Sequence, residues 1–507
     1  MEVELKIALA PRHIARLEGD ALIGDSGGAT RSLDAIYFDT PAHALSQRGV
    51  ALRLRQDRGS WTQAIKGGGS VQAGLHRRVE IETPMEVPVP DLARVADSEL
   101  GKLALRAVGR GKLGPVFRVS MERLTRVVSP APGVTIEVSL DRGVIRADKA
   151  RIAVSEVELE LQAGPAWRLF EFALRIAERY PVRIEHRSKA ERGYALARGI
   201  SAAPVKAQLG VVRRGMTAAE AFKAVCWTCI NHMQANHAGV LRGADPEYLH
   251  QMRVALRRLR SGLGAFATLL PPGAEERPVA AVQRLACALG PARDWDVFVD
   301  ATLTPLMKQF PEHYGLGRLE RACAGLRQSA HRAANLAVAS PDYHRLVLSM
   351  GGWLTEEPWV AELTPSQALA LRAPVTRHAK AVLERDYQRI RKRGRALARL
   401  DFAQMHRLRI AAKKLRYAAG FFAPLFSRVR VEPMLEALND LQDVLGAIND
   451  SATAQELIKA AARESGEPLR RQPRAIVRDW TRTALEHHRQ ALGRSWKAFR
   501  ACAHFWR

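Results

Sequence analysis

The spacing of the apolar residues changes near residue 200, and this change constrains the fold more than any other feature. Before it, apolar and polar residues alternate, which is typical of half-buried strands; after it, apolar residues recur at helical spacing. A chain of 507 residues is long enough for about two to four domains. We therefore predict a domain at residues 1–203, a linker at 204–214 and a second domain at 215–507.

The first domain is predicted to be an antiparallel sheet or barrel with few helices. The alternation is clearest at residues 2–7, 52–55, 79–82, 134–140 and 157–161. Turn-forming residues occur at 57–59, 67–69 and 141–143. Helical spacing is confined to about 91–107 and 165–179. Short strands separated by such turns are typical of an antiparallel sheet or barrel.

The polar faces of these strands are dense in charge. Glu2, Glu4 and Lys6 share one face of the first strand, and Arg53 and Arg55 share one face of another. A half-exposed sheet with solvated charges is one interpretation, but five such strands favour a closed barrel with a polar lumen. Acidic residues two positions apart can share a divalent cation, and basic residues opposite them can bind phosphates. This combination indicates phosphoryl transfer to water.

An ordered set of motifs across residues 2–193 resembles the CYTH, or triphosphate tunnel metalloenzyme, superfamily. It comprises Glu2-x-Glu4-x-Lys6, Tyr37-Phe38-Asp39-Thr40, Leu52-Arg53-Leu54-Arg55, Lys66, Arg78-x-Glu80-x-Glu82, Arg123, Glu137 with Asp141, the Glu156–Glu160 strand and Ser188-Lys189-x-x-Arg192-Gly193. The resemblance implies an eight-stranded antiparallel tunnel with flanking helices. It also implies metal-dependent hydrolysis of inorganic triphosphate to pyrophosphate and phosphate, with Mg²⁺ or Mn²⁺ as the cofactor.

The resemblance also implies a role for each charged residue. The expected metal ligands are Glu2, Glu4, Glu158 and Glu160. The expected phosphate-binding catalytic residues are Lys6, Arg53, Arg55, Lys66, Arg78, Arg123, Lys189 and Arg192. Glu80, Glu82, Glu137 and Asp141 are expected to hold these groups in position. Arg118 and Arg123 differ in parity, so only one of them enters the lumen of a regular strand, and the family pattern favours Arg123. No Ser or Cys nucleophile is suggested, so we expect direct attack by metal-activated water.

The second half contains an internal repeat. His250-x-x-Arg253-x-x-x-Arg257-Arg258-x-Arg260 recurs 156 residues later as His406-x-x-Arg409-x-x-x-Lys413-Lys414-x-Arg416. A second element, Leu289-Gly290-x-x-Arg293-Asp294, recurs at the same offset as Leu445-Gly446-x-x-Asn449-Asp450. Two blocks with one offset predict two copies of a helical unit about a pseudo-twofold axis. Within each copy the basic residues share one helix face.

These repeats resemble the CHAD domain, the conserved-histidine α-helical domain, over about 213–505. The resemblance implies two pseudo-symmetric four-helix bundles with a basic pore that binds inorganic polyphosphate. The expected polyphosphate-binding residues are His250, Arg253, Arg257, Arg260, His406, Arg409, Lys413 and Arg416. The second copy departs from the first by Arg→Lys at 413 and 414, which keeps the charge and loses the bidentate geometry.

The charge of the chain supports a polyanionic partner. The net charge is +26, of which residues 1–200 carry +6 and residues 201–507 carry +20. The basic stripes contain no aromatic residue on which bases could stack, so we expect a base-free phosphate polymer and no nucleic acid. No run approaches eighteen apolar residues, so no membrane span is expected. Five cysteines and the absence of a signal-like start predict a reducing cytoplasm. An association with polyphosphate granules is expected from the resemblance alone.

Two other functions fit the sequence. One is cleavage or cyclisation of an organic triphosphate such as ATP or thiamine triphosphate in the same tunnel. The other is a non-catalytic protein that docks on polyphosphate or nucleic acid. The paired acidic residues favour catalysis, because phosphate binding alone has no need of them. The sequence leaves open the oligomeric state and the question of whether the two domains share a substrate.

Overall fold

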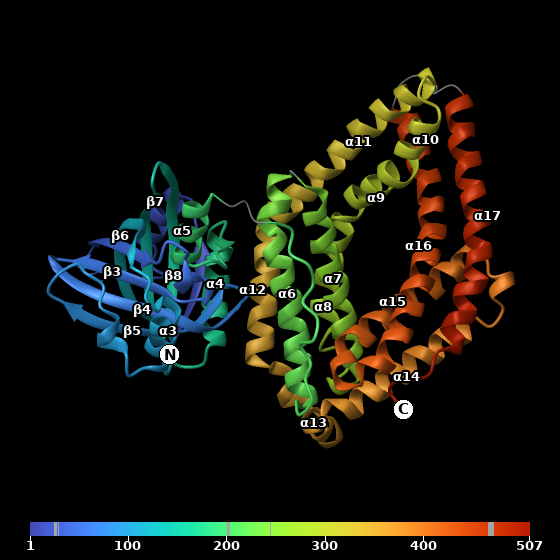
Figure 1. Cartoon of the computed structure of the whole chain (residues 1–507). Coiled ribbons are helices and arrows are strands. Elements are labelled where there is room, and N and C mark those ends of the chain that lie inside the picture. Colours follow the sequence, from blue (N-terminus) through green and yellow to red (C-terminus); the bar gives the residue numbers. More distant parts are fainter. Residues whose placement is uncertain (25–27, 29, 200–202, 244, 465–470) are drawn as a thin grey trace. The chain divides into compact units, whose positions relative to one another are not determined.

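The computed structural model describes residues 1–24, 28, 30–199, 203–243, 245–464 and 471–507. The chain forms two compact units (Figure 1). Unit 1 comprises Met1–Ala203 and Pro341–Glu357, and unit 2 comprises Pro204–Ser340 and Pro358–Arg507. A helix from the middle of the second half, α12 (Pro341–Glu356), therefore belongs to unit 1. Within the described ranges, no helix has the length and apolar character needed to cross a membrane.

Unit 1 is built around a closed antiparallel barrel, which confirms the fold expected for the first half. The strands are β1 (Glu2–Ala8), β2 (Thr30–Asp39), β3 (Ala51–Asp57), β4 (Ser60–Gln72), β5 (Leu75–Met85), β6 (Gly114–Ala131), β7 (Val134–Ala147) and β8 (Ala150–Ala163). They pair in the order β5-β4-β3-β2-β6-β7-β8-β1, and β1 pairs back with β5 to close the barrel. A two-residue strand, β9 (Arg183–Ile184), pairs antiparallel with the end of β1. Strand alternation therefore points one face of every strand into a common lumen.

Helices cover the apolar outside of the barrel. They are α1 (Pro11–Glu18), α2 (Ala44–Gln47), η1 (Leu92–Val95), α3 (Glu99–Val108), α4 (Trp167–Arg179) and α12, whereas α5 (Lys189–Arg198) packs against lumen-facing side chains of β6. Leu5 and Ile7 of β1 are fully buried, and α4 packs against this strand. The apolar face of α4 also packs against α12, where Gly351 lies directly against Phe170. These contacts leave the charged strand faces to line the lumen.

Two of the three turns predicted in the barrel are wrong. Residues 67–69 lie inside β4, where the register with β5 shifts between Gly67 and Gly69. Gly69 has φ +125°, and a Cβ there would lie 1.8 Å from the backbone oxygen of Arg77, so these glycines permit a β-bulge. Residues 141–143 lie inside β7, where Gly143 lets β6 approach closely. The predicted turn at 57–59 is present between β3 and β4.

Unit 2 is helical, as predicted, and its helices follow the repeat. They are α6 (Ala218–Arg242), α7 (Pro246–Phe266), η2 (Ala267–Leu269), α8 (Glu276–Ala288), α9 (Gly290–Phe298), the π-helical turn η3 (Val299–Leu303), α10 (Thr304–Gln309), α11 (Tyr314–Ala339), η4 (Pro358–Glu362), α13 (Pro365–Arg372), α14 (Val375–Arg393), η5 (Leu397–Arg399), α15 (Phe402–Phe422), η6 (Ala423–Leu425), α16 (Arg428–Glu464) and α17 (Arg471–Ala501). The two basic motifs lie on α7 and α15, which begin and end at positions 156 residues apart.

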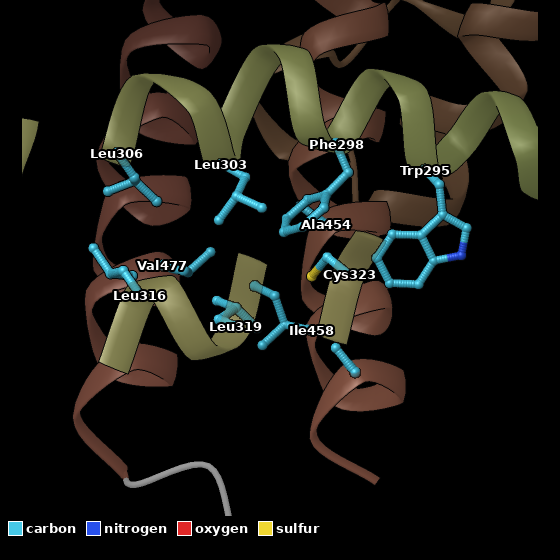
Figure 2. Packing of buried hydrophobic residues seen from close by; sticks show 11 residues of the cluster. Trp295, Phe298, Leu303, Leu306, Leu316, Leu319, Cys323, Ala454, Ile458 and Val477 are labelled. Atoms are coloured by element: carbon cyan, nitrogen blue, oxygen red, sulfur yellow. The ribbon is translucent and has the colours of Figure 1, made fainter. Parts of the chain in front are cut away.

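The helices of the two repeats interleave into two groups. In the first group, aromatic contacts join α6, α7, α14 and α15, with Phe266 of α7 against Phe222, His378 and Phe422. In the second group, α9, α10 and α11 share one apolar cluster with α16 and α17 (Figure 2). Phe298, Leu319 and Ile458 belong to this cluster. Each group therefore takes helices from both repeats.

The packing of α5 on the barrel yields a test. A Cβ on Gly193 would lie 2.1 Å from the ring of Phe117, which is held between Tyr37 and Tyr194 at ring-centroid distances of 4.4 and 5.0 Å. We expect Gly193→Ala to destabilise unit 1 by about 1–3 kcal/mol through overpacking, measured as a lower thermal midpoint. Gly114→Ala is the control, because no atom would lie within 4 Å of its added methyl group. Equal midpoints for the two variants would contradict this packing.

Candidate functional site

The barrel encloses a cavity of about 790 Å³ that is lined by charged residues of its strands and of α5. The residues predicted for the tunnel all line this cavity except Asp141 and Arg192, which are buried beside it. Arg123 faces the cavity, whereas Arg118 is half exposed on the outside and lies 3.4 Å from Asp34. The regular alternation of β6 therefore admits only Arg123 to the lumen, as the family pattern favours.

The strand register sorts the lumenal carboxylates into two clusters. On β8, Glu160 lies opposite Glu4 of β1 and Glu137 of β7. Together with Glu2, these three residues form what we call the outer acidic cluster. Two residues further back along β8, Glu158 lies opposite Lys6. The inner acidic cluster comprises Asp141, Glu156 and Glu158.

Cations of the protein itself neutralise the inner acidic cluster. One oxygen from each of its three carboxylates lies within 4.8 Å of the others, a spacing that could hold a metal ion. The Lys189 ammonium, however, contacts all three, at 2.6 Å from Asp141, at 2.9 Å from Glu158 and in a short contact with Glu156. Arg123 adds a bidentate pair with Asp141, donating at 2.7 and 2.6 Å.

These contacts set the protonation of the inner cluster. Burial opposes the charge of Glu158, but Lys189, Lys6 and Arg123 outweigh it and hold the pKa of this carboxyl well below its usual range. Burial likewise opposes the charge of Lys189, but the three carboxylates raise its pKa above the ordinary value. Glu158 and Asp141, whose pKa is also lowered by Lys189 and Arg123 against the effect of burial, are therefore ionised and paired with cations of the protein.

The outer acidic cluster carries a surplus of negative charge. Burial and then the charges of Glu2, Glu137 and Glu4 raise the pKa of Glu160 to about 7, against an ordinary value of 4.5. Lys66, which lies 2.9 Å from Glu2, opposes this shift only in part. The four carboxylates line one cavity and offer the hard oxygen donors that Mg²⁺ and Mn²⁺ prefer. Of the two clusters, the inner one is the more closely spaced and the outer one is the less neutralised by cations of the protein.

A basic wall on β3, β4 and β5 faces the outer cluster. Its side chains are held by carboxylates, with the pairs Arg53–Glu80 at 3.1 Å, Arg55–Glu82 at 3.0 Å, Lys66–Glu80 at 2.6 Å and Arg78–Glu191 at 3.1 Å. These side chains are largely shielded, but they line the cavity rather than fill it. Glu80 pairs with Arg53 and Lys66, and Glu82 pairs with Arg55, while the positioning function expected for these two carboxylates stays a prediction. Such a wall can bind phosphate oxygens through guanidinium and ammonium groups.

The start of α5 places Lys189 and Arg192 against the barrel. Ser188 caps the helix by accepting from the Glu191 N–H at 3.1 Å, and Glu191 accepts in return from the Ser188 N–H at 2.7 Å. Lys189 is then the first helical residue, and Arg192 lies one turn later on the same face. Arg192 donates to Glu156 at 2.5 Å. The capping box therefore determines which basic side chains enter the barrel.

Three residues at this site were not predicted. Glu156 pairs with Lys189 and Arg192, and its parity with Glu158 on the same strand was a usable signal. Glu191 holds Arg78, which no local pattern indicates. His76 is fully buried opposite Glu4 on β5, and burial together with Lys6 and Arg78 lowers its pKa to about 2. The imidazole is therefore neutral beside the charged lumen.

A second cavity, of about 430 Å³, lies among the helices of unit 2. Four residues of the predicted basic stripes line it: Arg257 of α7 and Arg409, Lys413 and Arg416 of α15. His250, Arg253, Arg260 and His406 are not among its lining residues. Arg253 instead donates to the backbone oxygen of Ala286 at 2.8 Å. The structure thus brings together one of the four residues of the first stripe and three of the four of the second.

The electrostatics of this second cavity differ from those of an isolated stripe. Burial and then the charges of Arg409 and Arg257 lower the pKa of Lys413 to about 7. Asp294 of α9 and Asp450 of α16 also line the cavity and partly balance its cations. These two aspartates occupy equivalent positions in the second repeated block. They were part of the repeat in the sequence, but no role was predicted for them.

Comparison with known proteins agrees with this architecture. The family model described as "CYTH domain" matches residues 1–194, and the model described as "CHAD domain" matches residues 224–459. The chain is 30% identical over 206 residues to the "Inorganic triphosphatase" of Haemophilus influenzae, a match covering 38% of this chain and 54% of that protein. It is 25% identical over 500 residues to an uncharacterized protein of Mycobacterium tuberculosis, covering 92% of this chain and 90% of the relative.

Among solved structures, the CHAD domain from the plant Ricinus communis is similar to this chain, with a TM-score of 0.52 and 30% identity. The match covers 60% of this chain and 98% of the plant domain. The fold and the matches together define a two-domain protein in which a barrel with a charged lumen precedes a basic helical domain. The chain belongs to the CYTH family over residues 1–194 and to the CHAD family over residues 224–459.

The raised pKa of Glu160 yields a second test. Its folded pKa of about 7 exceeds the ordinary 4.5, so the contribution of this group to stability is present below about pH 4.5 and is lost as the pH rises through 7. In the absence of divalent cations, we expect Glu160→Gln to raise the thermal midpoint by a few degrees at pH 8 and to leave it unchanged at pH 5. Glu122→Gln, on an exposed position of β6, is the control. A Glu160→Gln effect that is the same at both pH values would contradict the charge crowding.

Proposed function

We propose that residues 1–203 form a metal-dependent triphosphatase that hydrolyses inorganic triphosphate to pyrophosphate and phosphate. One observation carries this proposal. A single cavity holds a surplus of carboxylates on β1, β7 and β8 and a wall of cations on β3, β4 and β5. Phosphate binding alone has no need of the carboxylates, and metal binding alone has no need of the cations. Together they suit a polyphosphate anion that is bound with a divalent metal.

The outer acidic cluster would hold the metal, Mg²⁺ or Mn²⁺. The donors would be Glu2, Glu4, Glu137 and Glu160, because Lys189 and Arg123 already neutralise Glu158. This proposal departs from the sequence-based ligand set, since Glu137 takes the place of Glu158. The bound metal would offset phosphate charge and polarise the phosphorus–oxygen bonds. Glu158 would instead position Lys6 and Lys189, to which it is bonded.

The cations of the basic wall would bind the triphosphate by exchanging partners. Arg53, Arg55 and Lys66 now donate to Glu80, Glu82 and Glu2. Phosphate oxygens can replace these acceptors while the side chains keep their extended positions. Because the exchange trades one ion pair for another, little desolvation cost is added. Lys6, Arg123 and Lys189 would mark the inner end of the bound substrate.

Water is the proposed nucleophile. The five cysteines of the chain, Cys226, Cys229, Cys287, Cys323 and Cys502, all lie outside residues 1–203. Ser188, which lines the cavity, is committed to capping α5. The cavity has no serine with an imidazole among its lining residues, so a phosphorylated enzyme has no support. Direct transfer of the terminal phosphoryl group to water is the reaction that these residues can serve.

Inorganic triphosphate is the proposed substrate because of the Haemophilus influenzae relative, whose name is that of an inorganic triphosphatase. That match covers about half of the relative's length, 54%, and 38% of this chain. An organic triphosphate such as ATP would need a place for its nucleoside. Tyr37 and Tyr194 line the cavity, but their rings are packed against Phe117 and are not open for stacking.

We further propose that unit 2 binds inorganic polyphosphate through its basic helices. Arg257, Arg409, Lys413 and Arg416 converge on one cavity from both repeats. The remaining stripe residues, His250, Arg253, Arg260 and His406, would extend this surface outside the cavity. Binding of a phosphate polymer would release counterions and would therefore weaken with salt. Polyphosphate held there would raise the local concentration of phosphate chains near the protein.

The catalytic proposal predicts the effect of single substitutions. Glu4→Gln and Lys6→Ala should each lower kcat/KM for tripolyphosphate with Mg²⁺ by about 100-fold or more, because each removes a charge that the reaction needs. Phosphate release from tripolyphosphate and ATP, assayed in parallel, is the measurement. Glu122→Gln, at an exposed position of β6, should leave the rate unchanged. Undiminished release by Glu4→Gln would refute the metal site, and a preference for ATP would replace the proposed substrate.

The polyphosphate proposal predicts a loss of binding from unit 2. Arg409→Gln combined with Lys413→Gln should weaken binding of long-chain polyphosphate by about tenfold or more. Arg407→Gln, an exposed residue on the same helix, is the control. Affinities for polyphosphate and for RNA should be compared over a range of salt concentrations. If the same modest salt concentration displaces both polymers equally, the preference for a base-free polymer is wrong.

A further inference from the structure

The cavity of unit 2 has two chemically different sides. One side carries the cations of α7 and α15. The other side carries apolar and aromatic side chains: Phe298 of α9, Leu457 of α16 and Trp480 of α17. The basic stripes in the sequence do not indicate these residues, because they lie on other helices. A site for inorganic phosphate alone has no use for the apolar side.

The apolar side belongs to the core of the second helix group. Phe298 and Ala454 line the cavity and are also members of the buried cluster shown in Figure 2. Leu457 and Trp480 are partly buried and pack against that cluster. The wall is therefore preformed by packing, with Trp480 still partly exposed toward solvent. A rigid, partly open aromatic wall can receive a planar ring.

The cationic side has unused hydrogen-bond donors. The Nε atoms of Arg257 and Arg409 are buried, and neither has a hydrogen-bond partner among the residues that the structure describes. Unpaired buried donors of this kind cost free energy unless a ligand or water meets them. Both guanidinium groups line the cavity from opposite repeats. The two Nε atoms have almost no accessible surface, so an anion in the cavity would meet these donors only after the two side chains turned toward it.

Carboxylates in the cavity lining add a third requirement for the ligand, which is to supply hydrogen-bond donors. Asp294, Asp443 and Asp450 line the same cavity. Inorganic polyphosphate at neutral pH carries almost no donor hydrogens for these acceptors, whereas ribose hydroxyl groups and base amino groups do. A ligand that matches the cations, the apolar residues and the carboxylates has phosphates, an apolar ring and donor groups. A volume of about 430 Å³ lies within the usual range of about 300–1,000 Å³ for small-molecule sites.

We infer that this cavity binds a nucleoside polyphosphate, with the phosphates against Arg257, Arg409 and Lys413 and the base against Trp480. The inference rests on the proposed anion binding at these cations and gives that site a regulatory ligand. A nucleotide bound there would occupy the cations that polyphosphate needs. The two ligands would therefore compete, and nucleotide would release polyphosphate from unit 2.

Photoaffinity labelling of the full-length protein tests this assignment. The probe is 8-azido-ATP in EDTA, and the labelled peptides are located by mass spectrometry. We expect labelling on α16 or α17 near Leu457 and Trp480, and we expect excess ATP to suppress it. Labelling confined to residues of the barrel would overturn the inference. Mapping the labelled residues keeps the two cavities distinct in one experiment.

Matched variants separate ring recognition from phosphate binding. Trp480→Ala should reduce ATP binding about tenfold, as loss of one stacked base predicts, and should leave tripolyphosphate binding to unit 2 within twofold. Trp480→Phe should restore most of the ATP affinity. Arg409→Gln should weaken both ligands. If Trp480→Ala changes ATP and tripolyphosphate binding equally, the aromatic wall does not recognise the base.

A further variant controls for loss of binding that is caused by misfolding. Ala484→Phe adds a ring to the cavity from α17 and keeps Trp480 in place. It should block 8-azido-ATP labelling while the thermal midpoint stays near that of the parent protein. In the parent protein, polyphosphate binding without any competition from ATP would overturn the inference and leave the proposed function intact. Absence of polyphosphate binding by the parent protein, with ATP labelling retained, would overturn the proposed polyphosphate binding and leave the inference intact.

Discussion

The buried ammonium group of Lys189 among three carboxylates is the interaction on which the barrel interior depends. Removing an ion from water costs several kcal/mol even after the protein relaxes, and three neighbouring carboxylates cannot all ionise without counter-charges. Lys189, supported by Arg123 and Arg192, supplies them. The inner end of the barrel is therefore stable only when α5 lies against it. The capping box at Ser188 and the close contact of Gly193 with Phe117 both serve that position.

The same charge balance gives glutamate side chains of the barrel different pKa values. Glu158 and Glu160 lie two residues apart on one strand, yet the pKa of the first is held well below its ordinary value and that of the second is raised to about 7. The difference comes from the neighbours, since cations surround one and carboxylates surround the other. Glu158 is consequently a fixed structural charge, whereas Glu160 belongs to a group that Lys66 and Lys6 neutralise only in part. Chemistry is to be expected where the charges of the protein are incompletely balanced.

Much of this arrangement could be predicted from the sequence because strand parity is strict. The alternation placed Glu2, Glu4 and Lys6 in one lumen, and it separated Arg123 from Arg118. Contacts between distant elements could not be predicted in this way. The glycines at 67–69 resemble a turn locally, and only the pairing with β5 makes them a bulge. The membership of α12 in unit 1 and the aromatic wall opposite the basic stripes likewise depend on packing across more than a hundred residues.

The interleaving of the two repeats in unit 2 has a further consequence. Because each helix group draws on both repeats, one repeat alone would expose the apolar faces that the other now covers. The cooperative unit is thus equivalent to a dimer whose subunits are joined in one chain. Association of two separate subunits would depend on their concentration. Because the two repeats are joined in one chain, their association is intramolecular. A single chain also allows the two repeats to differ in sequence. Arg257 and Lys413 occupy equivalent positions of the two repeats and line the same cavity, whereas a dimer of identical subunits would have the same residue at both positions.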